Sequence, residues 1–297
     1  RSPQPEWRLQ KLPRGKKVMI YMEQGMGDEL MFSFFLKFAD TIAPGQLVVE
    51  CDDRLVPIFE RSFPSIEFCP RSVPIQPRLF ADDVLYKLPV GHLPSLFCPE
   101  LRKLILERWA VALESCVAGY GWLLPAPDGV RHWREELRQL GSDDRICVGV
   151  AWRSKNLTRT RKLQYLTPAE LASSLPDGSI AVNLQYVYDQ EELEELTALA
   201  KVRGIDVVTF PDLDLKDDLV GVVDLCGALD AIVTPLTSTA FMGGSMGVPT
   251  WVFRTSEYKC ISSVTKQEKT ALNMGPLYQK PDINASGETQ RAGTRMT

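Results

Sequence analysis

A glycine-rich loop near the start of the chain is the first segment whose residue types and spacing suggest chemistry. Gly25 and Gly27 are followed directly by Asp28 and Glu29, after an apolar run and before a helical pattern. Free amides at such a helix start can face an anion or a sugar hydroxyl. Asp28 is then a candidate general base, because a helix N-terminus helps a carboxylate to stay ionised. The residues leave open the alternative of a tight turn in which both acids only complement the helix dipole.

A group of cations in the middle of the chain suggests a phosphate site. Five lysines and arginines fall within ten residues, directly after another apolar run. At the carboxyl end of a strand such a group suits a diphosphate, because arginine can bind two oxygens at once. The alternative is a solvated basic loop. The cations are Arg153, Lys155, Arg159, Arg161 and Lys162, with Ser154 between the first two.

Two later segments carry polar side chains between an expected strand and an expected helix. Thr237, Ser238 and Thr239 can cap the helix that follows them or bind a phosphate together with its free amides. Residues 211–218 contain four aspartates, of which we expect one to cap a helix and the others to lie near a cleft. A metal site or an acid/base pair is the less common use of such carboxylates.

The remaining metal-binding and charged residues exclude several classes of function. The seven cysteines include no C-x-x-C pair and there are only two histidines, so we expect neither a disulfide framework nor a zinc site. His132 is interpreted as a surface or interdomain residue, whereas His92 lies in a loop that can reach a cleft. The net charge of -4 offers no general positive field for nucleic acid, so any phosphate site must be local.

The elements that must position these residues alternate between apolar runs and helical patterns, which predicts an α/β fold with parallel sheets. Ligands of such sheets bind beyond the carboxyl ends of the strands. Strands are expected over residues 18–22, 47–51, 66–69, 84–88, 146–152, 180–185, 206–210, 231–234 and 250–253. Helices are expected over residues 28–41, 55–61, 101–116, 130–140, 168–175, 190–202, 216–226 and from 239.

The length of 297 residues predicts two domains, at about 150 residues per domain. A Pro- and Gly-rich stretch places the boundary at about 125–144. No apolar run is long enough to span a bilayer and the start lacks a signal-peptide core, so a cytoplasmic location is expected. The tail, residues 281–297, has almost no apolar side chains and is expected to be disordered. The opening without methionine suggests a piece of a longer chain.

Five segments, taken in their order, resemble a known family. They are Gly-Met-Gly-Asp-Glu at 25–29, Val-Gly-Val-Ala-Trp-Arg-Ser at 148–154, Asn-Leu-Gln-Tyr at 183–186, Pro-Asp-Leu-Asp-Leu-Lys-Asp-Asp at 211–218 and Gly-Val-Pro-Thr-Trp at 247–251. This order resembles the glycosyltransferase unit of bacterial tetratricopeptide-repeat proteins, which is of GT-B type and distantly similar to lipopolysaccharide heptosyltransferases. The similarity spans about residues 17–253.

The resemblance implies two Rossmann-like domains that face an interdomain cleft. It assigns 1–16 to an N-terminal extension, 17–140 to the acceptor domain and 141–280 to the nucleotide-sugar donor domain. By similarity Asp28 is the catalytic base, with Gly25, Gly27, Glu29 and His92 on the acceptor side. The donor-binding residues implied by similarity are Arg153, Ser154, Arg161, Lys162, Gln185, Tyr186, Leu213, Asp214, Thr237, Ser238 and Thr239.

The implied activity is transfer of a hexosyl or heptosyl group from a nucleotide-diphosphate donor to a protein, glycan or lipid-linked acceptor. The expected chemistry is inverting and needs no metal or other cofactor. Nucleic acid is not an expected partner, and an upstream repeat domain is expected in a longer chain. Leu236 and Phe241 depart from the family, since relatives often have polar residues there.

Two alternatives stay open at this point. The apolar residues Leu236 and Phe241 are compatible with a GT-B module that binds a nucleotide sugar or glycan without catalysis. The first glycine loop, with Glu50 further on, is compatible with an NAD(P)-dependent oxidoreductase. Against the oxidoreductase, Leu30 stands where the third glycine of that fingerprint belongs.

Overall fold

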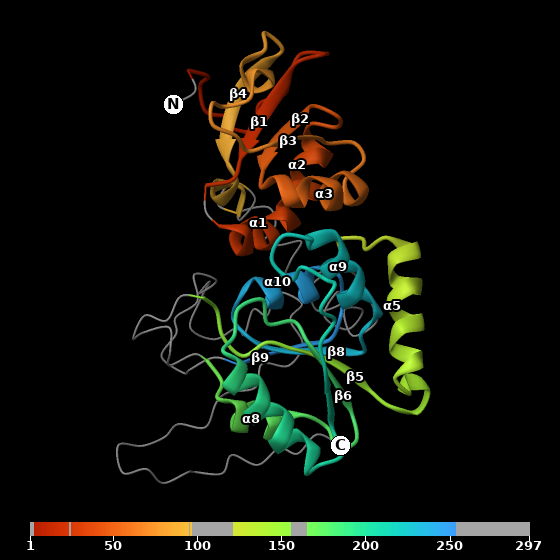
Figure 1. Cartoon of the computed structure of the whole chain (residues 1–297). Coiled ribbons are helices and arrows are strands. Elements are labelled where there is room, and N and C mark those ends of the chain that lie inside the picture. Colours follow the sequence, from red (N-terminus) through yellow and green to blue (C-terminus); the bar gives the residue numbers. More distant parts are fainter. Residues whose placement is uncertain (1–2, 24, 95, 97–120, 156–164, 254–297) are drawn as a thin grey trace, which may run out of the picture.

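The computed structural model describes residues 3–23, 25–94, 96, 121–155 and 165–253 (Figure 1). The helix predicted over residues 101–116, the cations Arg159, Arg161 and Lys162, and the tail 281–297 lie outside the described residues. No helix in the described part of the chain is long and apolar enough to cross a membrane.

The first unit is built on a parallel sheet of order β3-β2-β1-β4. Its two faces use alternate residues, because neighbouring side chains of a strand point to opposite sides. Val18 and Ile20 pack into the main core, whereas Met19 packs with Val48 in a smaller cluster on the other face. The strands are β1 (Lys17–Tyr21), β2 (Leu47–Cys51), β3 (Glu67–Pro70) and β4 (Val84–Pro89), and the helices are α1 (Met26–Phe32), α2 (Leu36–Ile42), α3 (Val56–Ser62) and the short η2 (Asp53–Leu55), η3 (Pro77–Phe80) and η4 (Val90–His92).

The helix predicted over residues 28–41 is divided into α1 and α2 by a turn of 3-10 helix, η1 (Ser33–Phe35). The Ser33 hydroxyl donates to the Leu30 carbonyl at 2.7 Å and accepts from the Trp122 indole nitrogen at 2.8 Å. A serine hydroxyl bonded back to its own helix competes with the regular backbone pattern. The division thus coincides with a hydrogen bond from Trp122, which is far away in the sequence.

The second unit is built on a parallel sheet of order β7-β6-β5-β8-β9. Cores on both faces explain why its strands are almost entirely apolar. On one face Val148 and Val150 pack with α7 and α8, and on the other Ile180 and Val182 pack with α5, α9 and α10. The strands are β5 (Cys147–Val150), β6 (Ile180–Asn183), β7 (Asp206–Val208), β8 (Ala231–Pro235) and β9 (Thr250–Phe253), and the helices are α5 (Pro127–Gln139), η5 (Ser142–Asp144), α7 (Pro168–Ser174), α8 (Gln190–Lys201), α9 (Leu219–Ala228) and α10 (Ser238–Ser245).

The helix predicted to begin at residue 216 begins instead as α9 at Leu219. The Asp214 carboxylate accepts the amides of Lys216 at 2.8 Å and Asp217 at 3.0 Å, which forms a turn. Asp218 then caps the helix by accepting the Gly221 amide at 2.9 Å. Two carboxylates of this segment thus accept hydrogen bonds from backbone amides, as short acidic side chains do at helix starts.

The two units meet through helices at the ends of their sheets. In Figure 1, α1 lies between the first sheet and the second unit and faces α10, and the two helices are in contact. A continuous apolar cluster contains residues of both units, among them Ile20 and Ile232. Helix α5 packs along α9 and therefore belongs to the second unit.

Candidate functional site

Each sheet has a position where the connections of two neighbouring parallel strands lead toward opposite edges of the sheet. Ligands of open α/β sheets bind in the crevice at this point. In the first sheet the position lies between β1 and β4. The loop after β1 is the glycine loop, and the residues after β4 are Val90–His92. The two segments are close, since a Cβ at Gly91 would lie 3.3 Å from a Glu23 carboxylate oxygen. The structure therefore brings the glycine loop and the His92 segment together.

The start of α1 positions Asp28 at this edge. Gly25 precedes the helix in extended conformation, and its carbonyl accepts the amides of Asp28 at 2.9 Å and Glu29 at 3.2 Å. The side chain of Asp28 is half-buried. Within the described ranges, the Asp28 carboxylate forms no hydrogen bond or ion pair. Among the described residues, no partner therefore holds this carboxylate within the fold.

Glu29, the neighbour of Asp28 in the sequence, is bonded within the fold. Its side chain is 1% exposed, one carboxylate oxygen accepts the Asp52 amide at 2.8 Å, and the other pairs with Arg71. Burial raises the pKa of Glu29, and the Asp52 amide and Arg71 oppose that rise. Arg71 also donates to the Met22 carbonyl at 3.0 Å. Glu29 thus ties together the carboxyl ends of β1, β2 and β3.

His92 is exposed over 56% of its side chain, and its Nδ1 lies 3.1 Å from a carboxylate oxygen of Glu6. The ring therefore contacts the N-terminal segment in this structure. The second histidine, His132, lies on α5 in the second unit, next to Trp133.

The equivalent position of the second sheet lies between β5 and β8. Residues 151–155 follow β5, and Leu236 to Thr239 follow β8 and lead into α10. Thr237 stands at the N-cap of α10 in extended conformation without a side-chain cap, and its hydroxyl lies 3.2 Å from that of Thr234. Ser238 and Thr239 are half-buried in the first turn. The start of α10 therefore offers amides and hydroxyls at the predicted phosphate position.

Arg153 is held by acidic residues that sequence reasoning missed. Its side chain is 8% exposed, and its guanidinium lies 2.9 Å from Glu192 and 3.3 Å from Asp189. Burial raises the pKa of Glu192, but hydrogen bonds from Arg153, the Asp189 amide and Trp152 outweigh burial and lower it. Asp189 and Glu192 also form a capping box at the start of α8. Their D-x-x-E spacing signals a cap, but not that it reaches Arg153.

Gln185 is also engaged by the fold itself. It is 1% exposed, and its side-chain oxygen accepts the amides of Trp152 and Arg153, both at 3.0 Å. Its side-chain nitrogen donates to the Val187 carbonyl at 2.8 Å. Gln185 therefore joins the loops after β5 and β6. The neighbouring Tyr186 is half-buried, and its hydroxyl accepts the Lys155 amide at 3.4 Å.

Other predicted donor residues lie at the same edge with partners of their own. The hydroxyl of Ser154 bonds to that of Tyr165. Leu213 is 8% exposed and packs into the main core. Two backbone amides, those of Asp217 and Lys216, lower the pKa of Asp214. Arg161 and Lys162 are outside the described residues.

The two sheet edges meet at Gly27. A Cβ at Gly27 would lie 3.6 Å from the Ser238 Cα and 3.7 Å from the Phe241 ring. Phe241, apolar where a polar residue was expected by resemblance, packs with Leu236 and Ala240 and faces Gly27. This apolar contact brings the start of α1 against the start of α10.

A second contact across the edges is polar. Arg54 donates to the Lys216 carbonyl at 2.9 Å and to the Asp217 carboxylate at 3.3 Å. Asp52 holds the same guanidinium with two bonds of 2.8 Å. Nothing in the sequence marks this pairing, because its two halves come from separate surface loops.

Within the residues that the structure describes, no group of three or more His, Cys, Asp or Glu side chains is arranged to hold a metal ion. The cysteines described, Cys51, Cys69, Cys147 and Cys226, are buried free thiols, and burial raises the pKa of Cys226 to about 12.

Comparison with known proteins gives one curated relative and several solved structures. The chain is 33% identical over 261 residues to protein FlbA of Caulobacter vibrioides, an alignment that covers 83% of this chain and 40% of that protein. The chain thus spans less than half of the relative's length. No family model matches the sequence.

Two solved structures share the architecture. A family 9 glycosyl transferase from Veillonella parvula superposes with a TM-score of 0.56 at 15% identity, covering 81% of this chain and 82% of that one. The ADP-heptose lps heptosyltransferase II of E. coli superposes with a TM-score of 0.56 at 14% identity, covering 92% of each chain. At such identities the likeness concerns the fold. With two parallel sheets and their carboxyl-end helices in contact, the chain has the GT-B fold of glycosyltransferases, as its motifs predicted.

Proposed function

We propose that this protein transfers a sugar from a nucleotide-diphosphate donor bound to the second unit onto an acceptor bound to the first. The observation that carries the proposal is the contact of α1 with α10 at Gly27 and Ser238. It brings a carboxylate without a partner among the described residues, Asp28, close to a helix start that suits phosphate.

In this reaction Asp28 takes the proton of an acceptor hydroxyl. The acceptor oxygen then forms a bond to the anomeric carbon of the donor sugar, while the bond from that carbon to the diphosphate oxygen breaks. Attack from the side opposite the leaving group inverts the anomeric configuration. The half-buried position of Asp28 and the absence of a described cation beside it suit a general base.

The leaving diphosphate acquires charge that must be stabilised. We assign this role to the amides of α10 with Thr237, Ser238 and Thr239, and to Ser154, Arg161 and Lys162. Arg153 joins them if a phosphate displaces Glu192 or Asp189. Helix amides and cations replace a metal in this scheme. Tyr186, Gln185, Leu213 and Asp214 would lie near the nucleoside, as the resemblance implies.

The donor is proposed to carry a hexosyl or heptosyl group, because one solved structure of the same fold is named as an ADP-heptose transferase. We propose a protein, glycan or lipid-linked acceptor and a cytoplasmic site of action. We propose that the domain boundary lies before α5, because α5 packs on α9, whereas the resemblance implied a boundary at residues 140–141. Asp224 of α9 accepts the Ala126 amide at 2.6 Å at this boundary.

A GT-B module that binds without catalysis is the second candidate. Two observations favour it: Arg153 and Gln185 are already bonded within the fold, and Phe241 places an apolar ring at the predicted donor edge. An oxidoreductase is disfavoured because Leu30, at the position of the third glycine, is fully buried in the core.

A screen of nucleotide sugars separates these candidates. Thermal shift with ADP-, UDP-, GDP- and CMP-linked sugars identifies the donor, because a ligand stabilises the state that binds it. Release of nucleotide from the stabilising donor is then measured for wild type. Turnover supports the transferase, and selective binding without turnover, with or without cell-derived acceptors, supports the module. Stabilisation only by NAD(H) or NADP(H) contradicts both.

A further inference from the structure

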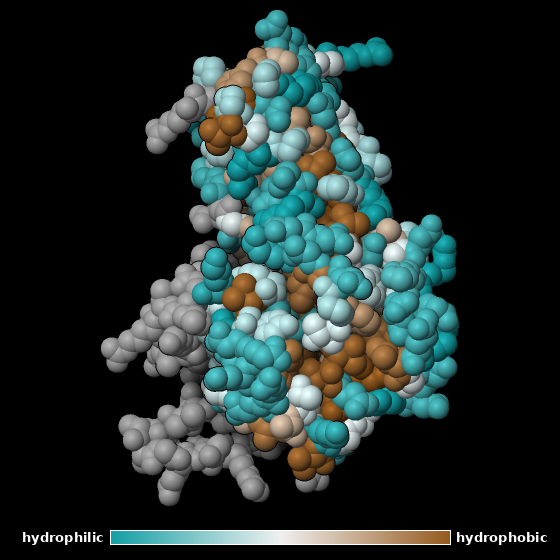
Figure 2. All heavy atoms as spheres, in the orientation of Figure 1, coloured by the Kyte–Doolittle hydropathy of each residue, from teal (hydrophilic) through white to brown (hydrophobic). Residues whose placement is uncertain are grey.

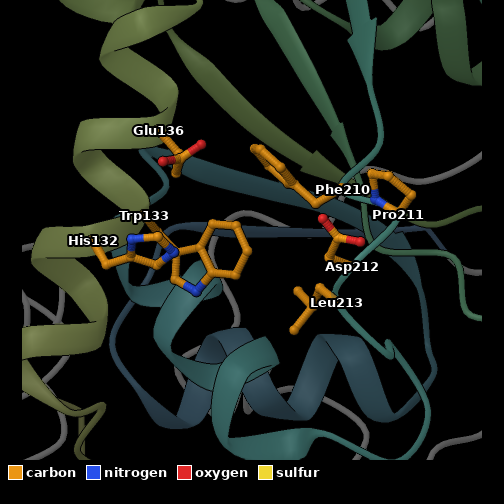
Figure 3. A pocket seen from close by; sticks show the side chains of 7 residues that line it. All are labelled: His132, Trp133, Glu136, Phe210, Pro211, Asp212 and Leu213. Atoms are coloured by element: carbon orange, nitrogen blue, oxygen red, sulfur yellow. The ribbon is translucent and has the colours of Figure 1, made fainter.

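A pocket separate from the α1–α10 contact lies between α5 and the loop that follows β7. Its volume is about 290 Å³, and it is lined by His132, Trp133 and Glu136 from the helix and by Phe210, Asp212 and Leu213 from the loop (Figure 3). Figure 2 shows apolar surface on the second unit beside the ridge of α5. None of the polar pocket residues has a role in the proposed transfer.

Two aromatic rings form a wall of the pocket. The rings of Trp133 and Phe210 are 4.8 Å apart between centroids with an interplanar angle of 57°, and the His132 ring lies 5.1 Å from Trp133. Trp133 and Phe210 pack on the main core, so their orientation does not depend on a ligand. An indole face attracts a cation through its quadrupole, most strongly when the cation is organic and weakly hydrated.

Two carboxylates from different elements complete the site. Figure 3 shows Glu136 and Asp212 on opposite sides of the Trp133 and Phe210 rings. Among the described residues, neither carboxylate has a hydrogen bond or an ion pair. Of the cations on α5, Arg131 pairs with Asp128 and Arg138 pairs with Glu135, and no ion pair in the described part of the chain joins Arg134 to either carboxylate.

The combination of aromatic wall and unpaired acids points to an organic cation. His132, Glu136 and Asp212 do not converge as metal ligands, since no such group occurs in the described part of the chain. The space is far larger than a bare ion and has an apolar floor at Leu213. A planar guanidinium can stack on indole and donate to two carboxylates at once.

We propose that this pocket binds a guanidinium group carried on an alkyl chain, stacked on Trp133 and paired with Glu136 and Asp212. Such a group occurs in free alkylguanidines and in arginine side chains of polypeptides, and the pocket chemistry is the same for both. The pocket shares Leu213 with the residues proposed to lie near the nucleoside, but guanidinium binding does not require the proposed sugar transfer.

Isothermal titration of the full chain with agmatine tests the proposal. We expect binding that weakens as salt rises from 50 to 500 mM. Glu136→Gln or Asp212→Asn should weaken binding by about tenfold, and Trp133→Leu by a similar factor. Glu135→Gln is the matched control, because Glu135 lies next to Glu136 but pairs with Arg138. It should bind agmatine as wild type does. Melting temperatures of all variants establish that they are folded.

The source of the group is separated by comparing agmatine with a short arginine-containing peptide and its citrulline counterpart. Tighter binding of the arginine peptide than of agmatine identifies a polypeptide ligand, and equal binding identifies a free alkylguanidine. Absence of agmatine binding, or binding that Glu136→Gln and Asp212→Asn leave unchanged, overturns the proposal. Displacement of agmatine by a nucleotide also overturns it, because the pocket would then belong to the donor. Donor turnover by wild type is a separate measurement, so each proposal can fail alone.

Discussion

The carboxyl edges of the two sheets differ in how much of their polar chemistry is already engaged. At the first edge Asp28 has no partner among the described residues, while its neighbour Glu29 is fully engaged with Asp52 and Arg71. At the second edge the side chains of Arg153, Gln185 and Asp214 are all bonded within the protein. Among the described residues, the first edge thus holds an acid without a partner, whereas these three side chains of the second edge are engaged.

The difference indicates how a nucleotide diphosphate would bind. With Arg153, Gln185 and Asp214 engaged, the proposed donor would be held by the amides and hydroxyls of α10, by cations outside the described ranges, or after displacement of an internal carboxylate. Helix amides are suited to this because their direction is set by the backbone. The proposed role of Asp28 needs no such rearrangement, because this carboxylate has no partner among the described residues.

The largest expected effect comes from Asp28→Asn. This change keeps the shape of the side chain but removes the proposed base, so we expect kcat of sugar transfer to fall by about a hundredfold or more. Donor affinity should stay near wild type, since the carboxylate lies on the first unit. Sugar transfer and nucleotide titration measure the two. Unchanged transfer with a lowered melting temperature would mean that Asp28 only complements its helix.

Arg71→Met tests the ion pair that holds Glu29 at the first edge. Glu29 would remain buried without its cation, which we expect to lower the free energy of unfolding by about 1–3 kcal/mol at pH 7.5. We expect a loss below the top of this range, because the Arg71 side chain is 38% exposed and solvent screens its ion pair. Urea unfolding measures the loss.

The pH dependence of this variant has a defined sign. Burial raises the pKa of Glu29 in the folded state, so protonation of Glu29 favours folding as pH falls through that value. Protonated Glu29 needs no cation, and the loss in Arg71→Met should therefore shrink from pH 7.5 to pH 5. The double variant Arg71→Met/Glu29→Gln should recover part of the stability at pH 7.5. A loss independent of pH would show that Arg71 acts through packing alone.

Glu192→Gln opens the network of the second edge. Release of Arg153 from its main partner should strengthen binding of the donor nucleotide by about two- to fivefold, and loss of the cap and ion pair should lower stability by about 1 kcal/mol. Calorimetry with the nucleotide found in the screen measures the affinity. Glu191→Gln is the control, since Glu191 is exposed beside it. Weaker binding in Glu192→Gln would show that Arg153 must stay anchored.

The smallest effect is expected for Gly27→Ala, where the edges meet. An added Cβ would lie at ordinary contact distance, 3.6 Å from Ser238 Cα, and alanine favours a helix by up to about 1 kcal/mol. The melting temperature should therefore stay equal or rise slightly. Gly27→Leu should instead separate α1 from α10 and lower it by several degrees. Gly25→Ala, where a Cβ meets no described atom within 4 Å, controls for the helix start. Tolerance of Gly27→Leu would contradict a tight contact between the edges.

Much of the fold was predictable because its signals are local. The strands Leu47–Cys51 and Thr250–Phe253 agree with their predicted ranges, since each is an apolar run between turn residues. The break at Ser33 was not predictable, because it involves Trp122. The start of α9 was misplaced by three residues for a local reason: the turn at Asp214 competes with helix.

The sequence by itself determined an α/β chain with parallel sheets and located the candidate residues at strand ends, because apolar periodicity and glycine turns act over a few residues. Only the tertiary structure decided which of the described side chains are bonded within the fold. Two partners of Arg153 lie 36 and 39 residues away, and Trp152 and Arg153 lie 33 and 32 residues from Gln185. Gly27 meets Ser238 of the other unit. Such pairings depend on how sheets and helices pack in space, and the local sequence around one residue does not indicate its partner.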